Sequence, residues 1–200
     1  MTEPRPTLRA LLALPTVPAP LSKSALVMID CQNTYREGVM QLEGVEPALK
    51  ECAALLQRAR AAGTPIIHIQ HDAGPGSPYD VRERIGAIAD IVAPVEGETV
   101  ITKAYPSSFE QTNLDAELKK HGVTDLVLAG FMTHVCVNST ARAAFNHGYR
   151  PTVVGNATAT RALPNPLGGT LPAEAVHTGA LAALADIFAI VVPSPDAIPT

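Results

Sequence analysis

The sequence predicts a three-layer α/β/α fold built on a six-stranded, mostly parallel sheet. Short apolar runs rich in branched residues alternate along the chain with stretches of helical periodicity, and glycine ends several of those stretches. Continuous apolar runs are typical of strands that are buried on both faces. Alternating strands and helices imply right-handed crossovers, parallel strands and helices on both faces of the sheet.

The first half of the chain contains two such strands and one helix. Residues 25–29 are an apolar run and predict a strand, as do residues 65–69. Between them, residues 46–62 have apolar positions at helical spacing. Residues 71–97 have little periodic pattern and contain several Gly and Pro residues. Such a long irregular connection predicts a lid or binding loop.

The second half continues the alternation. The pattern predicts strands at 99–102, 126–129, 151–154 and 187–192, and helices at 112–120, 135–148 and 173–184. We expect a single domain over residues 1–200, with an N-terminal arm at 1–22 that includes a short helix and a loose, Pro-rich tail at 193–200. The loop 158–172 is expected to help the lid select the substrate.

Composition narrows the classes of function. The formal charge is −4 and the basic residues are scattered, so we expect a small-molecule substrate and no nucleic-acid partner. Three cysteines at unrelated spacings do not suggest a disulfide framework, which indicates a reducing compartment and a cytoplasmic location. We expect no membrane partner, because no run approaches the roughly 20 apolar residues of a transmembrane helix.

Three reactive side chains fall at the carboxyl ends of predicted strands, where open α/β sheets bind ligands. They are Asp30, Lys103 and Cys136. Cys136 would lie near a helix N-terminus, which favours thiolate, with Asp30 as general base and Lys103 as electrostatic support. On that basis, Asp30→Asn should slow alkylation of the thiol. On spacing alone, a strand-end carboxylate, a solvated lysine and a buried structural cysteine remain open alternatives.

Three motifs carry a family resemblance. They are Asp30 with Gln32, the Lys-Ala-Tyr-Pro-Ser-Ser-Phe segment at 103–109, and Gly-Phe-Met-Thr-His-Val-Cys-Val at 130–137 followed by Thr-Ala-Arg-Ala-Ala at 140–144. With these motifs, the chain from about residue 24 to residue 192 resembles the isochorismatase-like cysteine hydrolases. That superfamily includes nicotinamidases, carbamoylsarcosine amidohydrolase, streptothricin hydrolase and the isochorismatases.

The resemblance implies a catalytic triad of Asp30, Lys103 and Cys136. It also implies a cis peptide bond before Met132 and an oxyanion hole formed by the N–H groups of Met132 and Cys136. The implied reaction is hydrolysis of a small amide or imide C–N bond through a cysteine thioester, without a cofactor. The family commonly forms dimers or tetramers, so we expect a homo-oligomer.

Seven further side chains are expected to bind substrate near this triad: Gln32, Tyr35, His71, Tyr105, Phe109, Phe131 and His134. For the aromatic residues core packing is the alternative, and for the two histidines it is a structural hydrogen bond at the rim or in a loop.

We expect no metal site. Nicotinamidases carry a histidine-containing metal motif after the first strand, whereas this chain has no histidine between Cys31 and Pro65. The tightest ligand-like cluster is His68, His71 and Asp72, but His68 and His71 do not share one face of a strand.

Two other functions remain as alternatives. One is hydrolysis of a vinyl ether, as in isochorismatases that lack the cysteine. The other is a thiol redox sensor or a non-catalytic interaction protein. A sensor would need Cys31 or Cys52 within disulfide reach of the reactive thiol, and it would not need Asp30 and Lys103. The sequence does not indicate the substrate or the order of the oligomer.

Overall fold

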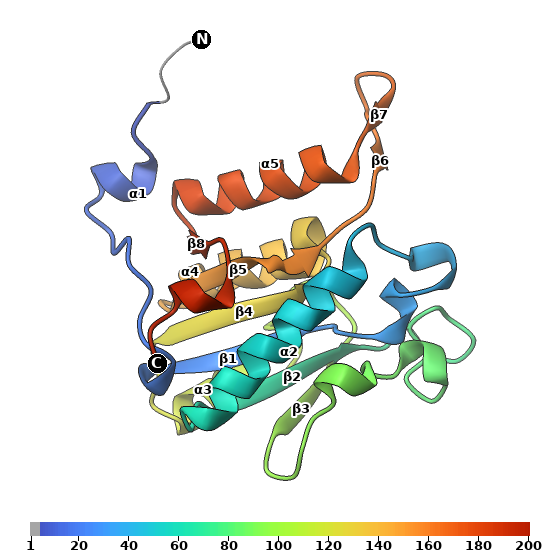
Figure 1. The fold of residues 1–200 in the computed structure, drawn as a ribbon, viewed down its shortest axis with the longest axis horizontal. Helices are drawn as coiled ribbons and strands as arrows, with labels where there is room; N and C mark the ends of the chain where they lie inside the picture. Colours follow the sequence, from blue (N-terminus) through green and yellow to red (C-terminus); the bar gives the residue numbers. More distant parts are fainter. Residues whose placement is uncertain (1–4) are drawn as a thin grey trace.

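The computed structural model describes residues 5–200, so residues 1–4 of the predicted arm lie outside the described part. It contains a six-stranded sheet with the strand order β3-β2-β1-β4-β5-β8 (Figure 1). Every neighbouring pair of these strands is parallel. The strands are β1 (Ser24–Ile29), β2 (Ile66–His71), β3 (Thr99–Lys103), β4 (Asp125–Phe131), β5 (Arg150–Ala159) and β8 (Ile190–Val192). The predicted fold class is confirmed.

Helices cover both faces of this sheet (Figure 1). The long helix α2 (Val45–Ala61) packs on one face, while α3 (Leu114–Lys120), α4 (Asn138–Asn146) and α5 (Ala173–Asp186) pack on the other. In β1, Leu26 belongs to the first core and Val27 to the second, and both are fully buried. Each such aliphatic side chain contributes roughly 1.5–3 kcal/mol to stability. In residues 5–200, no helix is long and apolar enough to cross a membrane.

The largest differences from the predicted element boundaries are in the second half of the chain. A π-helical turn (Thr133–Val137) precedes α4, so the predicted helix at 135–148 consists of two parts. Strand β5 continues to Ala159, and a small hairpin of β6 (Leu163–Pro164) and β7 (Thr170–Leu171) occupies the predicted loop 158–172. The last strand begins at Ile190, because the chain first ends α5 with a bond from the Ala189 N–H to the Leu184 carbonyl.

The C-terminal tail is not loose, which corrects the prediction. It contains a short 3₁₀ helix (Pro195–Ala197), and Ile198 is fully buried. The guanidinium of Arg58 on α2 donates to the carbonyl oxygens of Pro195 and Ile198. Pro199 accepts a backbone bond from Leu21. Arg58 therefore anchors the tail to α2 through two backbone carbonyl groups.

The N-terminal arm contains a single helical turn, α1 (Leu8–Leu11). It runs along one side of the molecule, away from the carboxyl ends of the strands (Figure 1). Arg9 is largely buried and donates to the carbonyl oxygens of Pro15 and Ile187, at 2.6 and 2.7 Å. These bonds attach the arm to the segment that follows α5.

Gly130 is required where β4 passes the end of β1. Its φ is +116°, and a Cβ atom there would lie 1.9 Å from the carbonyl oxygen of Ile29. Only glycine adopts this backbone without strain and leaves room for the neighbouring strand. The close contact sets the course of the chain into Phe131 and the turn that carries Cys136.

Candidate active site

Four neighbouring strands deliver four polar side chains to one edge of the sheet. Lys103 ends β3, His71 ends β2, Asp30 follows β1, and Cys136 lies in the turn after β4. The Nζ atom of Lys103 lies 2.7 Å from Oδ2 of Asp30 and 3.4 Å from Sγ of Cys136. The structure therefore brings together the three residues that the sequence singled out.

Asp30 is held in an unusual environment. Its φ is +48°, in the left-handed region, where a non-glycine residue costs about 1–3 kcal/mol. The side chain is completely buried, and within the described residues neither carboxylate oxygen makes a well-directed hydrogen bond. Its contact with Lys103 is thus an ion pair. Burial raises the pKa of Asp30 and Lys103 opposes that rise, so the carboxylate can accept a further proton.

The Cys136 thiol is buried beside this pair. Burial raises its pKa to about 12, the negative charge of Asp30 adds to the rise, and Lys103 opposes it. The resting group is therefore a thiol, and the expected bias toward thiolate is corrected. The sulfur is shielded from water and faces a carboxylate, and both effects disfavour the charged thiolate.

A pocket of about 180 Å³ opens in front of the sulfur. For comparison, a cavity of about 150 Å³ holds one benzene molecule. The pocket therefore admits a small substrate. Its walls are mainly apolar or aromatic, and they are formed by Tyr35, His71, Tyr79, Pro106, Met132, Val135 and Cys136. The peptide bond between Phe131 and Met132 is cis.

Comparison with known proteins identifies the family. The model of the isochorismatase domain matches residues 24–196. The chain belongs to the isochorismatase family. It is therefore a hydrolase, as the sequence predicted.

Relatives within the isochorismatase family extend over most of the chain. A secreted isochorismatase effector, Isc1, from Verticillium dahliae is 38% identical over 189 residues, which cover 94% of this chain and 97% of that protein. Ureidoacrylate amidohydrolase RutB from Stutzerimonas stutzeri is 32% identical, with 72% of this chain and 75% of that protein covered. The crystal structure of an isochorismatase from Pseudomonas putida KT2440 superposes with a TM-score of 0.93 at 37% identity, covering 98% of this chain and 100% of that chain.

Of the seven further residues expected to bind substrate, Tyr35 and His71 line the pocket of this isochorismatase-family site. Gln32 does not. Its fully buried amide accepts from the His71 N–H and donates to the carbonyl oxygens of His71 and Gly86, so it has no group left for a substrate. Gln32 instead fixes the backbone of His71.

The remaining four also lie outside the lining. Phe131 is fully buried behind Tyr35, and His134 bonds to the Thr160 hydroxyl at 2.5 Å. Phe109 stacks on His147, with ring centroids 4.9 Å apart. Tyr105 is exposed, and its hydroxyl accepts a bond from Gln111. Within the segment 103–109, Pro106 is the residue that lines the pocket.

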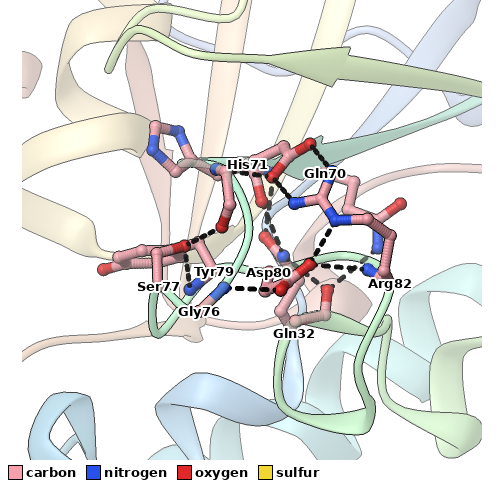
Figure 2. Close-up of polar contacts among 11 residues, drawn as sticks. Gln32, Gln70, His71, Gly76, Ser77, Tyr79, Asp80 and Arg82 are labelled. Atoms are coloured by element: carbon pink, nitrogen blue, oxygen red, sulfur yellow. Dashed lines mark hydrogen bonds and ion pairs between the residues drawn. The ribbon is translucent and has the colours of Figure 1, made fainter.

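The irregular loop after β2 places Tyr79 in the pocket, a residue that the sequence analysis did not select. The Arg82 guanidinium donates to both oxygens of Asp72, at 2.9 and 2.8 Å, and to Asp80 at 2.5 Å. Asp80 also accepts from the N–H of Gly76 at 2.7 Å, so the loop is closed on itself (Figure 2). Tyr79 lies between these fixed points, with its ring edge-on to His71 at 4.8 Å.

Arg161 is a second residue that the sequence analysis missed. It follows β5 by two residues, its Nε atom is buried without a hydrogen-bond partner, and no described carboxylate forms an ion pair with it. Its positive charge lowers the pKa of His134, after the larger effect of burial, and it also acts on Tyr79. Its charge therefore acts on Tyr79, which lines the pocket, although Arg161 itself is not part of the lining. The predicted strand ends at residue 154, so the sequence pattern does not place Arg161 near a strand end.

The side chains of the ligand-like cluster, His68, His71 and Asp72, are each held by another residue. Within residues 5–200, no three His, Cys, Asp or Glu side chains lie close enough together to hold a metal ion. His68 bonds to Glu98 at 2.8 Å, His71 faces Lys103, and Asp72 pairs with Arg82. The three side chains thus have three different partners.

Proposed function

We propose that this chain hydrolyses the C–N bond of a small amide or imide, using Cys136 as nucleophile and no cofactor. The observation that carries the proposal is the contact of the Lys103 ammonium with both the Asp30 carboxylate and the Cys136 sulfur in a buried, mainly apolar pocket. A thiol beside a base that can take its proton is the arrangement that nucleophilic catalysis requires.

In the first step, Cys136 Sγ attacks the carbonyl carbon while its proton moves to Asp30. The resulting tetrahedral oxyanion accepts hydrogen bonds from the N–H groups of Met132 and Cys136, each worth about 3 kcal/mol in the barrier if well directed. Asp30 then returns the proton to the leaving nitrogen as the C–N bond breaks, which leaves a thioester. Water, deprotonated by Asp30, hydrolyses the thioester and restores the thiol.

Lys103 keeps the Asp30 carboxylate charged despite its burial, and it stabilises the sulfur as negative charge develops there. The amidohydrolase named among the relatives supports C–N bond cleavage. The relative named as an isochorismatase supports vinyl-ether hydrolysis as a second candidate. The presence of Cys136 favours C–N bond hydrolysis, because a thioester intermediate forms on a cysteine nucleophile.

The redox-sensor alternative has less support. Cys31 and Cys52 belong to the core on the α2 face of the sheet, whereas Cys136 belongs to the core on the opposite face. The sheet therefore separates the Cys136 sulfur from both other thiols, and a disulfide to either would require the strands to part.

The proposal is tested by screening small amides, imides and ureides for release of ammonia or amine, with a vinyl ether such as isochorismate in parallel. We expect turnover of a C–N substrate by the wild type, a covalent adduct on Cys136 by mass spectrometry, and no turnover by a folded Cys136→Ala protein. Cleavage of the C–N substrate by Cys136→Ala would overturn covalent catalysis. Turnover of the vinyl ether alone would support the second candidate.

A further inference from the structure

The Lys103 ammonium has three N–H groups and no lone pair, so it can only donate. Its three neighbours are Oδ2 of Asp30 at 2.7 Å, Nδ1 of His71 at 3.2 Å and Sγ of Cys136 at 3.4 Å. The contact with Asp30 is an ion pair, and the contacts with His71 and Cys136 are hydrogen bonds. The contact with His71 requires that Nδ1 be the acceptor.

An imidazole that accepts at Nδ1 carries its proton at Nε2. Two charged groups face this ring: Lys103 from β3 and Asp72 at the end of β2. Burial, and then the Lys103 charge, lower the pKa of His71 to about 4, while Asp72 opposes the shift. The ring is neutral at pH 7, and its only donor is the Nε2–H group.

This donor is held at the pocket. The His71 backbone is fixed on both sides by Gln32, with two bonds of 2.9 Å, and the ring meets the edge of Tyr79. Figure 2 shows the imidazole pointing away from the network around Arg82. His71 and Cys136 line the same cavity, and no residue in the described range accepts a bond from Nε2.

We propose that the Nε2–H group of His71 donates a hydrogen bond to a second carbonyl-type oxygen of the substrate. The site then selects amides that carry such an acceptor near the scissile carbonyl, as ureides, imides and oxo-amides do, over simple alkyl amides. The reason is that a donor in an apolar pocket stays unpaired with an alkyl amide, and sites with unpaired polar groups reject such analogues strongly. This inference rests on the proposed amide hydrolysis.

The test compares acetoacetamide with 3-methylbutanamide, which have similar shapes but differ by a keto oxygen in place of a methyl group. Binding is measured as protection of Cys136 from iodoacetamide, so it does not depend on turnover. We expect wild-type protein to bind acetoacetamide at least ~10-fold more tightly. If the wild type does not distinguish the two compounds, or if neither protects the thiol, the inference is wrong.

Two substitutions separate the roles of the two ring nitrogens. His71→Asn keeps an acceptor near Lys103 but removes the Nε2–H donor, so this variant should lose the preference for acetoacetamide over 3-methylbutanamide. His71→Gln places an amide N–H near the position of Nε2, so this variant should keep most of that preference. A His71→Asn protein that melts like wild type and retains the full preference overturns the inference.

The tautomer is checked directly by ¹⁵N NMR of histidine-labelled protein, with His71 assigned from the His71→Asn spectrum. We expect the Nε2–H tautomer between pH 5 and 8. A proton on Nδ1, or a charged ring at pH 7, overturns the inference. Ammonia release is measured separately: protein that binds acetoacetamide selectively but cleaves no amide counts against the proposed function and not against His71.

Discussion

Lys103 Nζ and Asp30 Oδ2 are 2.7 Å apart, and neither side chain is accessible to solvent. Two opposite charges removed from water together are tolerable, whereas one left alone is strongly unfavourable. The pair explains why the site can keep a carboxylate beside a thiol. Burial and then the Asp30 charge raise the pKa of Cys136, and the consequences can be measured.

Asp30→Asn should lower the pKa of the Cys136 thiol from its value of about 12, because the negative charge that raises it is removed while Lys103 remains. This reverses the slower alkylation expected from the sequence. Turnover should fall by about 10²–10⁴-fold, because the general base is lost. The measurement is the pH dependence of Cys136 alkylation by iodoacetamide, read by peptide mass spectrometry.

The variant also breaks a buried ion pair, which costs about 3–5 kcal/mol, so its circular dichroism and melting curve are recorded first. If folded Asp30→Asn protein alkylates with an unchanged or higher apparent pKa, the Asp30 charge does not set the protonation of the thiol.

Arg82→Gln should raise KM several-fold with a smaller effect on kcat. The guanidinium closes the loop that holds Tyr79 in the pocket, but it does not touch Cys136. Arg84→Gln is the matched control, since Arg84 lies on the same loop and pairs with Glu37 at the surface. Equal KM values for the two variants would show that the Arg82 bonds do not position Tyr79.

Arg161→Gln should weaken binding of amides that carry a carboxylate by roughly 10-fold and leave neutral amides unaffected. A hydrogen bond to a charged group contributes about 1.5–3 kcal/mol, and no described carboxylate competes for Arg161. KM is measured for paired neutral and anionic amides. Arg161→Lys retains the charge and should retain most of the preference. If Arg161→Gln changes both substrate types equally, Arg161 is a structural residue.

The meeting of Asp30, Lys103 and Cys136 could be predicted from the sequence because parallel strands place their carboxyl ends together, and each residue ends or follows an apolar run. The protonation state of Cys136 could not be predicted from the sequence. It depends on burial and on the distance to Asp30, and neither is encoded in local spacing. The isochorismatase-like resemblance, and with it the class of enzyme, was confirmed by the family match.

Several residues that were expected to bind substrate lie outside the pocket lining for identifiable reasons. Gln32 lies two residues after Asp30 in the sequence, but its amide satisfies backbone groups of the neighbouring strand. Phe109 follows Lys103 closely, but the intervening turn directs its ring toward His147. Tyr79 lies in a loop without periodicity, so only the Asp80 and Arg82 contacts determine where its ring is placed.

Glu98 gives a stability prediction with a defined sign. Its carboxylate accepts bonds from Arg60, His68 and the Val95 N–H. These bonds outweigh the effect of burial and lower its pKa from 4.5 to about 2. A lowered folded-state pKa contributes stability that is present above the unfolded value and is lost as pH falls from 4.5 toward 2. After solvent screening we expect a contribution of about 1 kcal/mol.

Glu98→Gln should therefore be less stable than wild type at pH 7 by about 1 kcal/mol, and the deficit should shrink as pH falls below about 4.5, because the wild-type carboxyl then becomes protonated as well. Urea denaturation of both proteins at pH 7, 4.5 and 3 measures the difference. Carboxylates outside this cluster titrate equally in both proteins, so the difference reports on Glu98 together with His68, whose pKa depends on Glu98. A deficit that stays constant down to pH 3 would mean that the charge of Glu98 does not stabilise the link between β2, α2 and the loop before β3.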